Sequence, residues 1–189
     1  MTNIISIYAD GACRGNHAEY TIGGFGAILE FNGNNKELKY AVRGTTNNRM
    51  EITAVLAGLN EIKNDSIKNE NFAINIFSDS SYVINCMRKK WYEKWQKNNW
   101  KNSNKEPVKN KELWEELFER IEEIKKCKTE INFYHIKGHL DIKKELVLME
   151  NYKKFNKKNN LSFNEDEFFH VAEMNNRADK LANEAMDII

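Results

Sequence analysis

Four acidic residues that lie far apart in the sequence each border a segment with the pattern of a strand or a helix. They are Asp10, Glu51, Asp79 and Asp179. Carboxylates that meet in one cleft repel one another, so a fold tolerates such a group only when cations neutralise it or protons are taken up. Ligand sets made only of carboxylates favour hard ions such as Mg²⁺ or Mn²⁺. The first expectation is therefore metal-dependent chemistry on phosphate groups.

The residues around these acids predict an alternation of strands and helices. Short β-branched and aromatic runs predict five strands, at residues 4–9, 27–31, 36–43, 72–77 and 131–136. Apolar residues at helical spacing predict helices after residue 46, from residue 80 to about 87, around residues 113–124 and from about residue 176. This order predicts an α/β fold in which helices cover the faces of a mixed sheet.

The same pattern gives each acid a position from which it can reach the others. Asp10 and Asp79 are predicted to end the first and fourth strands, and Glu51 and Asp179 to lie at the starts of helices. Ligands of open α/β sheets bind at the carboxyl ends of the strands. If the first and fourth strands are neighbours, all four side chains can meet there.

Composition narrows the class of protein. The chain has 189 residues, 41% of them hydrophobic, which suits a single domain, and its net charge of +1 gives no global attraction to nucleic acid. Its three cysteines are widely spaced and include no Cys-x-x-Cys pair, so a disulfide framework or a zinc site is not expected. The sequence has no signal-peptide pattern and no membrane-spanning run, and a cytoplasmic monomer is expected.

Several stretches around the acids carry a further signal. They are residues 8–16, 24–29, 45–51, 78–83, 100–101, 107–110, 137–139 and 175–179. In order, these stretches resemble type 1 ribonuclease H, and the resemblance runs from about residue 4 to residue 187. Each piece is weak alone, but the ordered set is specific.

The resemblance implies a fold, an activity and a cofactor. The fold would be that of ribonuclease H: three antiparallel strands plus two parallel ones, with helices on both faces of the sheet. The activity would be endonucleolytic hydrolysis of the RNA strand of an RNA–DNA hybrid, giving 5′-phosphate and 3′-hydroxyl ends. Two Mg²⁺ ions, or Mn²⁺, would bind the four carboxylates, and His139 matches the catalytic histidine of the family.

The resemblance also implies how the hybrid is recognised. A 2′-hydroxyl both donates and accepts hydrogen bonds, so backbone groups and amide side chains suit it. The positions that match family contacts to the hybrid are Cys13, Arg14, Gly15, Asn16, Thr46, Asn47, Ser81, Trp95 and Asn110. Among these, Thr46 and Asn110 match a pocket for a DNA phosphate. Ser81 departs from the pattern, because it stands where the family often has a glutamine.

Residues 88–111 form a second, basic recognition element that we call the protrusion. It contains nine basic residues and two acidic ones, and the four tryptophans of the chain lie in it or close to it. A basic segment interleaved with aromatic residues suits a nucleic-acid backbone. The segment also matches a basic protrusion of the family, and this resemblance implies that Trp95 contacts the DNA strand. Trp114 lies on an apolar helical stripe and is expected to pack in the core.

Residues 141–173 depart from the family, whose usual member has a short loop between the positions of His139 and Asp179. The apolar residues of this insert predict two amphipathic helices joined by a polar turn and docked on the domain. The insert either pads the surface or closes over the active site.

Two other readings remain open. One keeps the fold and changes the substrate, as in a junction resolvase or a nuclease of the transposase type. The other is a non-catalytic hybrid-binding module, although none of the four acids is missing.

Overall fold

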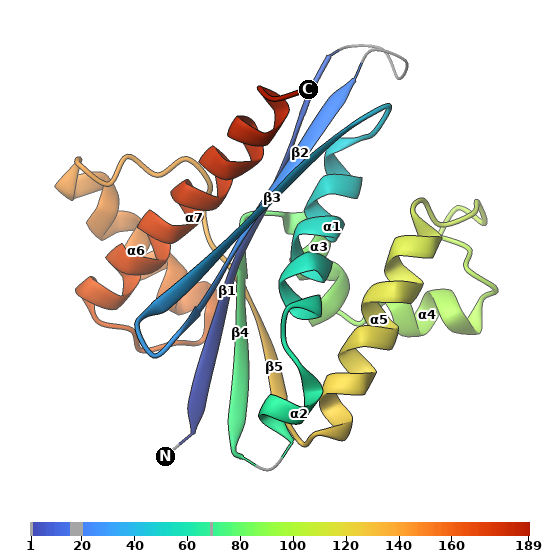
Figure 1. Cartoon of the computed structure of the whole chain (residues 1–189), viewed down its shortest axis with the longest axis horizontal. Coiled ribbons are helices and arrows are strands. Elements are labelled where there is room, and N and C mark those ends of the chain that lie inside the picture. Colours follow the sequence, from blue (N-terminus) through green and yellow to red (C-terminus); the bar gives the residue numbers. More distant parts are fainter. Residues whose placement is uncertain (1, 16–20, 69) are drawn as a thin grey trace.

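The computed structural model describes residues 2–15, 21–68 and 70–189, which build a twisted sheet with helices on both faces (Figure 1). The strands are β1 (Asn3–Arg14), β2 (Ile22–Phe31), β3 (Asn34–Arg43), β4 (Phe72–Ser78) and β5 (Glu130–His135). Their order in the sheet is β3-β2-β1-β4-β5. The first three strands pair antiparallel, and β4 and β5 run parallel to β1. This arrangement confirms the predicted fold class.

The helices divide between the two faces of the sheet (Figure 1). One face carries α1 (Asn47–Asn60), α2 (Asn64–Ile67), α3 (Ser81–Arg88), α4 (Trp91–Lys97) and α5 (Lys111–Lys126). The other face carries α6 (Glu145–Asn159) and α7 (Glu165–Met186). None of the helices in the described part of the chain is both long and apolar enough to cross a membrane.

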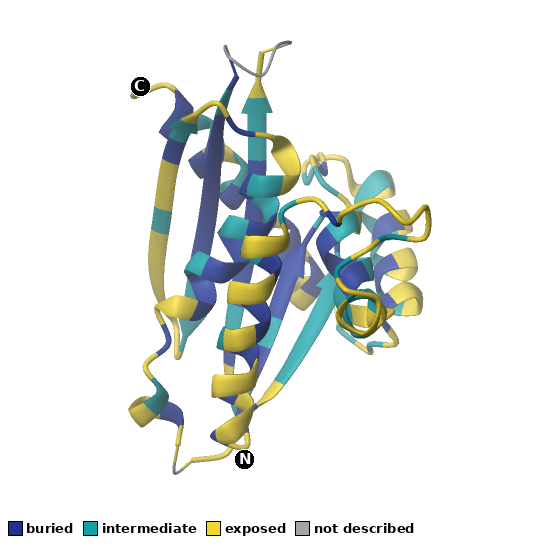
Figure 2. Ribbon diagram, turned by 90° about the vertical axis from the view of Figure 1, so that its right-hand side faces the viewer, coloured by how far each residue is buried: buried dark blue, intermediate teal, exposed yellow. Residues whose placement is uncertain are grey.

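β1 contributes side chains to two hydrophobic cores, one on each face of the sheet, because successive side chains of a strand point to opposite faces. Ile5 and Ile7 pack into the larger core, beneath α1 and α5. Tyr8 packs into the second core, beneath α6 and α7, where its ring stacks on Phe77 with 5.2 Å between centroids. Figure 2 shows the buried residues on the inner strands and on the inward faces of the helices. Asp10 has the same parity as Tyr8 and therefore faces α7.

β1 is longer than the sequence predicted. Its parallel pairing with β4 ends at Tyr8, opposite Phe77, but its antiparallel pairing with β2 continues to Arg14. The prediction that Asp10 ends the strand was therefore wrong, because β2 continues to offer backbone partners beyond that point. Asp79, in contrast, directly follows β4 as predicted.

The start of the last helix was predicted wrongly, and so was the place of Glu51 within its own helix. Asn164 caps α7 by accepting from Glu167 N at 2.9 Å, and Glu167 in turn accepts from Asn164 N at 2.7 Å. This reciprocal cap starts the helix well before residue 176, so Asp179 lies in its interior. The cap of α1 is Thr46, which puts Glu51 in the second helical turn.

The insert docks on the domain as predicted, but only one of its two expected helices is separate. α6 stands alone, and the second helix is the first part of α7. Phe155 of α6 and Phe168 of α7 are both buried, with 5.2 Å between their ring centroids, and Phe155 stacks on Phe77 of the sheet.

Candidate active site

The four acids lie together at one end of the sheet. Asp10 and Asp79 share a side-chain hydrogen bond, and both feel the charge of Asp179. Glu51 feels the charge of Asp79, and the pKa of Asp79 is in turn lowered by His139. The fold thus brings residues from β1, α1, the end of β4 and α7 to one place. Their roles as ligands and catalysts stay predictions at this point.

Two glycines let the helices come this close to the strands. A Cβ at Gly11 of β1 would lie 2.3 Å from Glu51 N, and a Cβ at Gly26 of β2 would lie 2.1 Å from Ala178 O. Atoms of a real side chain do not approach backbone so closely. The missing side chains therefore allow α1 to carry Glu51, and α7 to carry Asp179, up to the strands from opposite faces.

Asp10 is the most deeply placed of the four, with only 6% of its surface exposed. Burial raises the pKa of its carboxyl well above the usual range, and the charges of Asp79 and Asp179 raise it further. A hydrogen bond of 2.8 Å from Gly11 N to Asp10 Oδ1 opposes this shift. A carboxyl in such a position is neutral unless a cation compensates its charge.

Glu51 is held by a neighbour on each of its oxygens. Asn47 Nδ2 donates to Oε1 at 2.8 Å, and Ser80 Oγ donates to Oε2 at 2.5 Å. Ser80 also caps α3, because its hydroxyl oxygen accepts from Val83 N at 3.2 Å. Burial raises the pKa of Glu51, and the hydrogen bond from Ser80 works against this rise. One serine thus both starts α3 and orients an acid of the site.

Asp179 also has a partner on each oxygen. Asn183 Nδ2 donates to Oδ1 at 3.0 Å, and Oδ2 lies 3.5 Å from His139 Nδ1. Neither the role of Asn183 nor the link from Ser80 to Glu51 was predicted from the sequence. The contact from Asn183 to Asp179 could have been predicted, because residues four apart on a helix are neighbours.

The donor set fits a hard cation, although its oxygens are engaged with protein partners. Among the described residues, no group of three or more Asp, Glu, His or Cys side chains is arranged to hold a metal ion as it stands. Each carboxylate oxygen has a further lone pair, so it can bind a cation while it keeps its hydrogen bond. One turn before Asp179, the buried amide of Asn175 has no hydrogen-bond partner for either polar atom in the described part of the structure.

Arg49 connects two of the residues predicted to contact DNA. Its backbone N–H donates to Thr46 Oγ1 at 3.4 Å, and its guanidinium Nη1 donates to Asn110 Oδ1 at 3.3 Å. Arg49 also pairs with Glu112. The structure thus brings Thr46 and Asn110, 64 positions apart in the sequence, to the two sides of one arginine.

The end of β1 carries Cys13, Arg14 and Gly15, which were predicted to contact the hybrid. Cys13 Sγ lies 3.7 Å from Thr45 O, and burial raises the pKa of its thiol. Gly15 is exposed and has a φ of 104°, a conformation that favours glycine. Asn16 lies outside the described residues.

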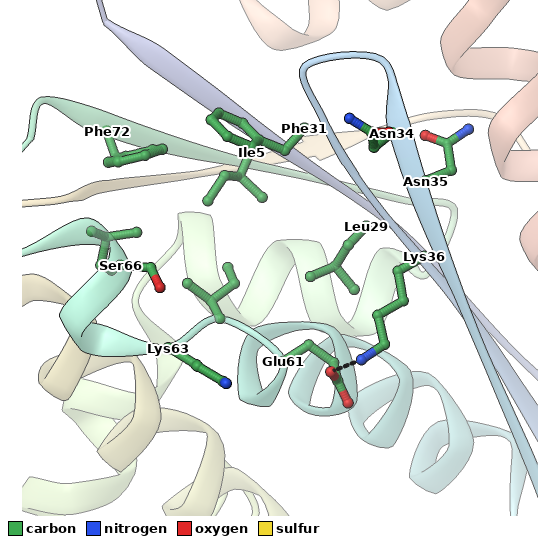
Figure 3. Close-up of a pocket in the computed structure, with 12 residues that line it drawn as sticks. Ile5, Leu29, Phe31, Asn34, Asn35, Lys36, Glu61, Lys63, Ser66 and Phe72 are labelled. Carbon is green, nitrogen blue, oxygen red and sulfur yellow. Dashed lines mark hydrogen bonds and ion pairs between the residues drawn. The ribbon is translucent and has the colours of Figure 1, made fainter.

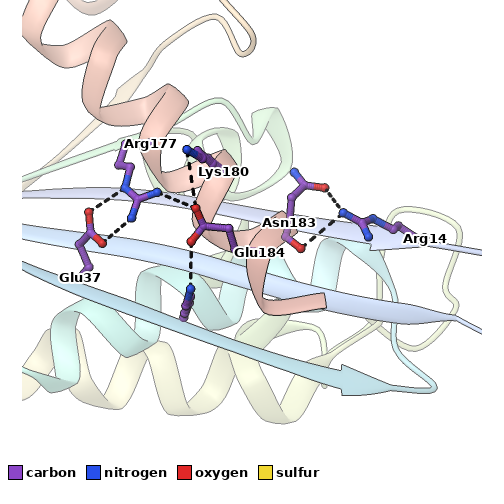
Figure 4. Close-up of polar contacts among 7 residues, drawn as sticks. Arg14, Glu37, Arg177, Lys180, Asn183 and Glu184 are labelled. Atoms are coloured by element: carbon purple, nitrogen blue, oxygen red, sulfur yellow. Dashed lines mark hydrogen bonds and ion pairs between the residues drawn. The ribbon is translucent and has the colours of Figure 1, made fainter. Parts of the chain in front are cut away.

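Arg14 points along α7 (Figure 4). Its Nη2 donates to Asn183 Oδ1 at 3.0 Å, and its Nη1 pairs with Asp187 Oδ1 at 2.5 Å. Further along α7, Arg177 donates to Glu37 of β3 at 2.7 and 2.8 Å and to Glu184 at 2.9 Å. These contacts fasten the helix that carries Asp179 to β1 and to β3.

Ser81 has a partner from β5. Its hydroxyl lies 3.0 Å from His135 Nε2. Burial first, and then the charges of Lys158 and Arg88, lower the pKa of His135 to about 4. The imidazole is therefore neutral at physiological pH and can donate to or accept from the serine.

The tryptophans of the protrusion form one cluster. Trp114 is fully buried, as predicted, and its Nε1 donates to Tyr82 Oη at 3.1 Å. Trp95 is half-buried, with its ring centroid 5.8 Å from that of Trp114 and 6.2 Å from that of Trp100. It borders a hollow of about 510 Å³ that Lys94 and Lys101 also line.

Another hollow, of about 420 Å³, lies at the opposite end of the sheet (Figure 3). Ile5, Phe31 and Phe72 line it, and the ion pair between Lys36 and Glu61 lies at its edge. Because Ile5 and Phe72 lie near the starts of parallel strands whose other ends carry the acids, this hollow does not belong to the acidic site.

A family model for RNase H matches residues 2–187. The chain belongs to the ribonuclease H family. A protein named ribonuclease H from Clostridium botulinum is 43% identical over 183 residues, which cover 97% of this chain and 95% of that protein. Another from Thermoanaerobacter sp. (strain X514) is 45% identical over 139 residues, or 74% of this chain and 81% of that protein. The chain is accordingly a ribonuclease H enzyme, and this family depends on divalent metal ions.

Solved structures show the same fold at lower identity. LC11-RNase H1 in complex with an RNA/DNA hybrid aligns over 97% of both chains, with a TM-score of 0.60 and 22% identity. LC9-RNase H1, described as a type 1 RNase H with the type 2 active-site motif, covers 83% of this chain and 74% of its own, with a TM-score of 0.59 and 22% identity. At this identity, the likeness shows the ribonuclease H fold alone.

Proposed function

We propose that this enzyme hydrolyses the RNA strand of RNA–DNA hybrids with the help of two Mg²⁺ ions, leaving 5′-phosphate and 3′-hydroxyl ends. The observation that carries the proposal is the buried carboxyl of Asp10 facing Asp79 and Asp179, because it needs cations to hold its charge. The family supports the chemistry, and the hybrid in the complex of LC11-RNase H1 supports the choice of substrate.

The ligands of the ions would be the four carboxylates, Asp10, Glu51, Asp79 and Asp179, and Mn²⁺ suits the same oxygen donors. When bound, the ions would lower the pKa of a water molecule and stabilise the charge on the departing 3′-oxygen. The protein orients two of these carboxylates: Asn47 and Ser80 donate to Glu51, and Asn183 donates to Asp179.

His139 is assigned the movement of a proton. It is exposed, and its Nδ1 lies 3.5 Å from Asp179 Oδ2, so its ring stands at the open side of the acidic site. An imidazole changes its protonation near neutral pH and can accept and release a proton within one reaction cycle. A group in this position can serve the attacking water or the departing oxygen.

Residues on two sides of the acids would hold the hybrid. The RNA side would use the end of β1 and its neighbours, namely Cys13, Arg14, Gly15, Asn16, Asn47 and Ser81. The DNA side would use the residues around Arg49 and the protrusion, namely Thr46, Asn110 and Trp95. Three exposed lysines of the protrusion, Lys89, Lys94 and Lys97, supply affinity and not chemistry. Their neutralisation is expected to weaken hybrid binding and its salt dependence while the saturated rate changes little.

Cleavage of matched hybrid, double-stranded RNA and duplex DNA tests the proposal. With Mg²⁺ or Mn²⁺ the enzyme is expected to cut only the RNA strand of the hybrid, and EDTA is expected to stop it reversibly. Asp10→Asn and Asp79→Asn are each expected to lower the rate at least ~100-fold while hybrid binding stays measurable. Turnover close to wild type in either variant would contradict the ligand assignment. Cleavage of branched DNA would favour a resolvase, and binding without cleavage would favour a non-catalytic module.

A further inference from the structure

A hollow of about 310 Å³ lies where α6 of the insert covers the end of β5. Its floor is apolar and consists of Leu140, Phe155 and Phe168. Its rim carries three exposed lysines, Lys137, Lys154 and Lys158. We call this hollow, with these six residues, the α6 subsite. It lies next to the acidic site, because Lys137 is two positions before His139.

The rim of the α6 subsite carries more positive than negative charge. Lys154 pairs with Glu150 at 2.5 Å, but Lys137 and Lys158 have no ion-pair partner within residues 2–15, 21–68 and 70–189. A further cation lies beside them, since Arg88 Nη2 donates to Lys158 O at 3.0 Å. Burial first, and then the charge of Arg88, lower the pKa of Lys158. Glu150 offsets part of this charge, because it pairs with Lys154 and also feels the charge of Lys137, but cations crowded in this way still gain from a further anion.

The subsite is held rigidly against the strand that leads into the active site. Asn159, the last residue of α6, is buried and acts like an extra strand partner for His135. Its Oδ1 accepts from His135 N at 3.0 Å, and its Nδ2 donates to His135 O at 2.9 Å. Arg88 Nη1 donates to the same Oδ1 at 3.0 Å. These hydrogen bonds fix the C-terminal end of α6, which carries Lys158, against the end of β5.

We propose that the α6 subsite binds a backbone phosphate of the hybrid, beyond the site of cleavage. The inference rests on the proposed function and extends it to the insert. A nucleic-acid strand that leaves the acidic site past His139 meets Lys137 first and Lys158 next. A lysine ammonium group is a compact positive charge that attracts phosphate oxygens. Each such contact raises the affinity for nucleic acid, and this contribution decreases as the salt concentration rises. The insert thereby becomes part of the substrate surface and not padding alone.

A double substitution with a matched control tests this subsite. K137Q/K158Q removes two rim charges, whereas K153Q/K157Q removes two exposed charges of α6 that do not line the hollow. Hybrid dissociation constants are measured in EDTA by fluorescence anisotropy at several salt concentrations, and kcat and KM are measured in Mg²⁺. K137Q/K158Q is expected to raise Kd and KM about 10-fold and to lower the salt slope by about one to two, with kcat unchanged. The control is expected to change each quantity less than about 2-fold, and K137R/K158R to restore binding.

Equal salt slopes and dissociation constants for the two Gln variants would overturn the subsite. A lower kcat with an unchanged Kd would also overturn it, because it would indicate that the lysines act on the acidic site and not on the hybrid. These outcomes are distinct from failure of the proposed function, in which the wild-type enzyme itself would not cleave the hybrid. The substituted lysines are all exposed, so matching thermal unfolding curves are expected for all variants.

Discussion

The side-chain amide of Asn183 donates hydrogen bonds of 3.0 Å to both the backbone carbonyl and the carboxylate of Asp179. Its amide cannot turn around easily, because its oxygen accepts from Arg14 Nη2 at 3.0 Å. The three residues form a chain from the end of β1 to the acidic site. Partners of this kind orient the first ligands of a metal and tune their affinity.

Asn183→Ala is therefore expected to weaken Mg²⁺ binding about 10-fold, because Asp179 Oδ1 loses the donor that orients it. Isothermal titration with Mg²⁺ and the Mg²⁺ dependence of cleavage measure this effect. Lys180→Ala serves as the control, since Lys180 is exposed on the same helix and only its distant contact of 3.9 Å to Glu184 is lost. The same Mg²⁺ affinity in both variants would remove Asn183 from the positioning role.

The raised pKa of Asp10 predicts an unusual dependence of stability on pH. Since the folded pKa lies above the unfolded value of about 4, the unfolded chain releases this proton first. In EDTA, the free energy of unfolding is then expected to fall as pH rises from about 4 through the folded pKa. Asp10→Asn removes this penalty, so the variant is expected to be more stable than wild type at neutral pH.

Thermal unfolding in EDTA at pH 4 and pH 7 checks this prediction. A gain on the order of 1 kcal/mol corresponds to about 2–4 °C in Tm for a chain of this size. The gain is expected at pH 7 and not at pH 4. Added Mg²⁺ is expected to raise the Tm of wild type and to have little effect on the variant. If the variant is less stable than wild type at pH 7 in EDTA, then burial and the neighbouring acids do not destabilise the charged form of Asp10.

Ser80 has two roles, as the cap of α3 and as a donor to Glu51, and their effects can be measured separately. Ser80→Ala removes both the cap of α3 and the donor to Glu51 Oε2, so a loss of about 1 kcal/mol in stability and a weaker response to Mg²⁺ are expected. Ser80→Thr keeps a hydroxyl and is expected to restore both. Chemical denaturation and Mg²⁺ titration measure the two effects separately. An alanine variant that loses stability but keeps its Mg²⁺ dependence would leave Ser80 only as a cap.

The insert is expected to contribute to stability through its aromatic contacts. Phe155 is buried between Phe77 and Phe168, and its truncation to alanine leaves a cavity in the second core. Phe155→Ala is expected to cost about 3–5 kcal/mol in the free energy of unfolding, measured by urea denaturation. Leu146→Ala is the matched control on the same helix, because Leu146 is 87% exposed. Similar small losses in both variants would show that α6 is only loosely attached.

The sequence predicted the sheet and its order of elements well, because β-branched runs and helical stripes are local signals. It misjudged two boundaries that depend on partners elsewhere. β1 continues past Asp10 because β2 pairs with it as far as Arg14. α7 starts early because Asn164 and Glu167 cap each other, so the second predicted helix of the insert merges with the last helix. The end of β1 is thus set by its pairing with β2, and the start of α7 by its capping residues, and neither is marked by a run of apolar residues.

The acids themselves could be found from their flanking motifs, but their surroundings could not. Ser80 reaches Glu51 across 29 positions, and Asn159 reaches His135 across 24, so neither contact leaves a periodic trace in the sequence. The crowding that shifts the pKa of Asp10 likewise comes from residues brought together only by the fold. Motifs identify the chemistry, whereas tertiary packing determines how each group is oriented.

Because Asp179 lies in the interior of α7, fraying of the helix ends does not displace its carboxylate. The helix runs from Glu165 to Met186, so about four turns precede this carboxylate and about two follow it. Fraying at either terminus therefore unwinds other turns first. Amide hydrogen exchange is expected to be slowest around Asp179 and faster toward both ends of the helix. The carboxylate of Asp179 would then stay in the acidic site while the terminal turns open and close.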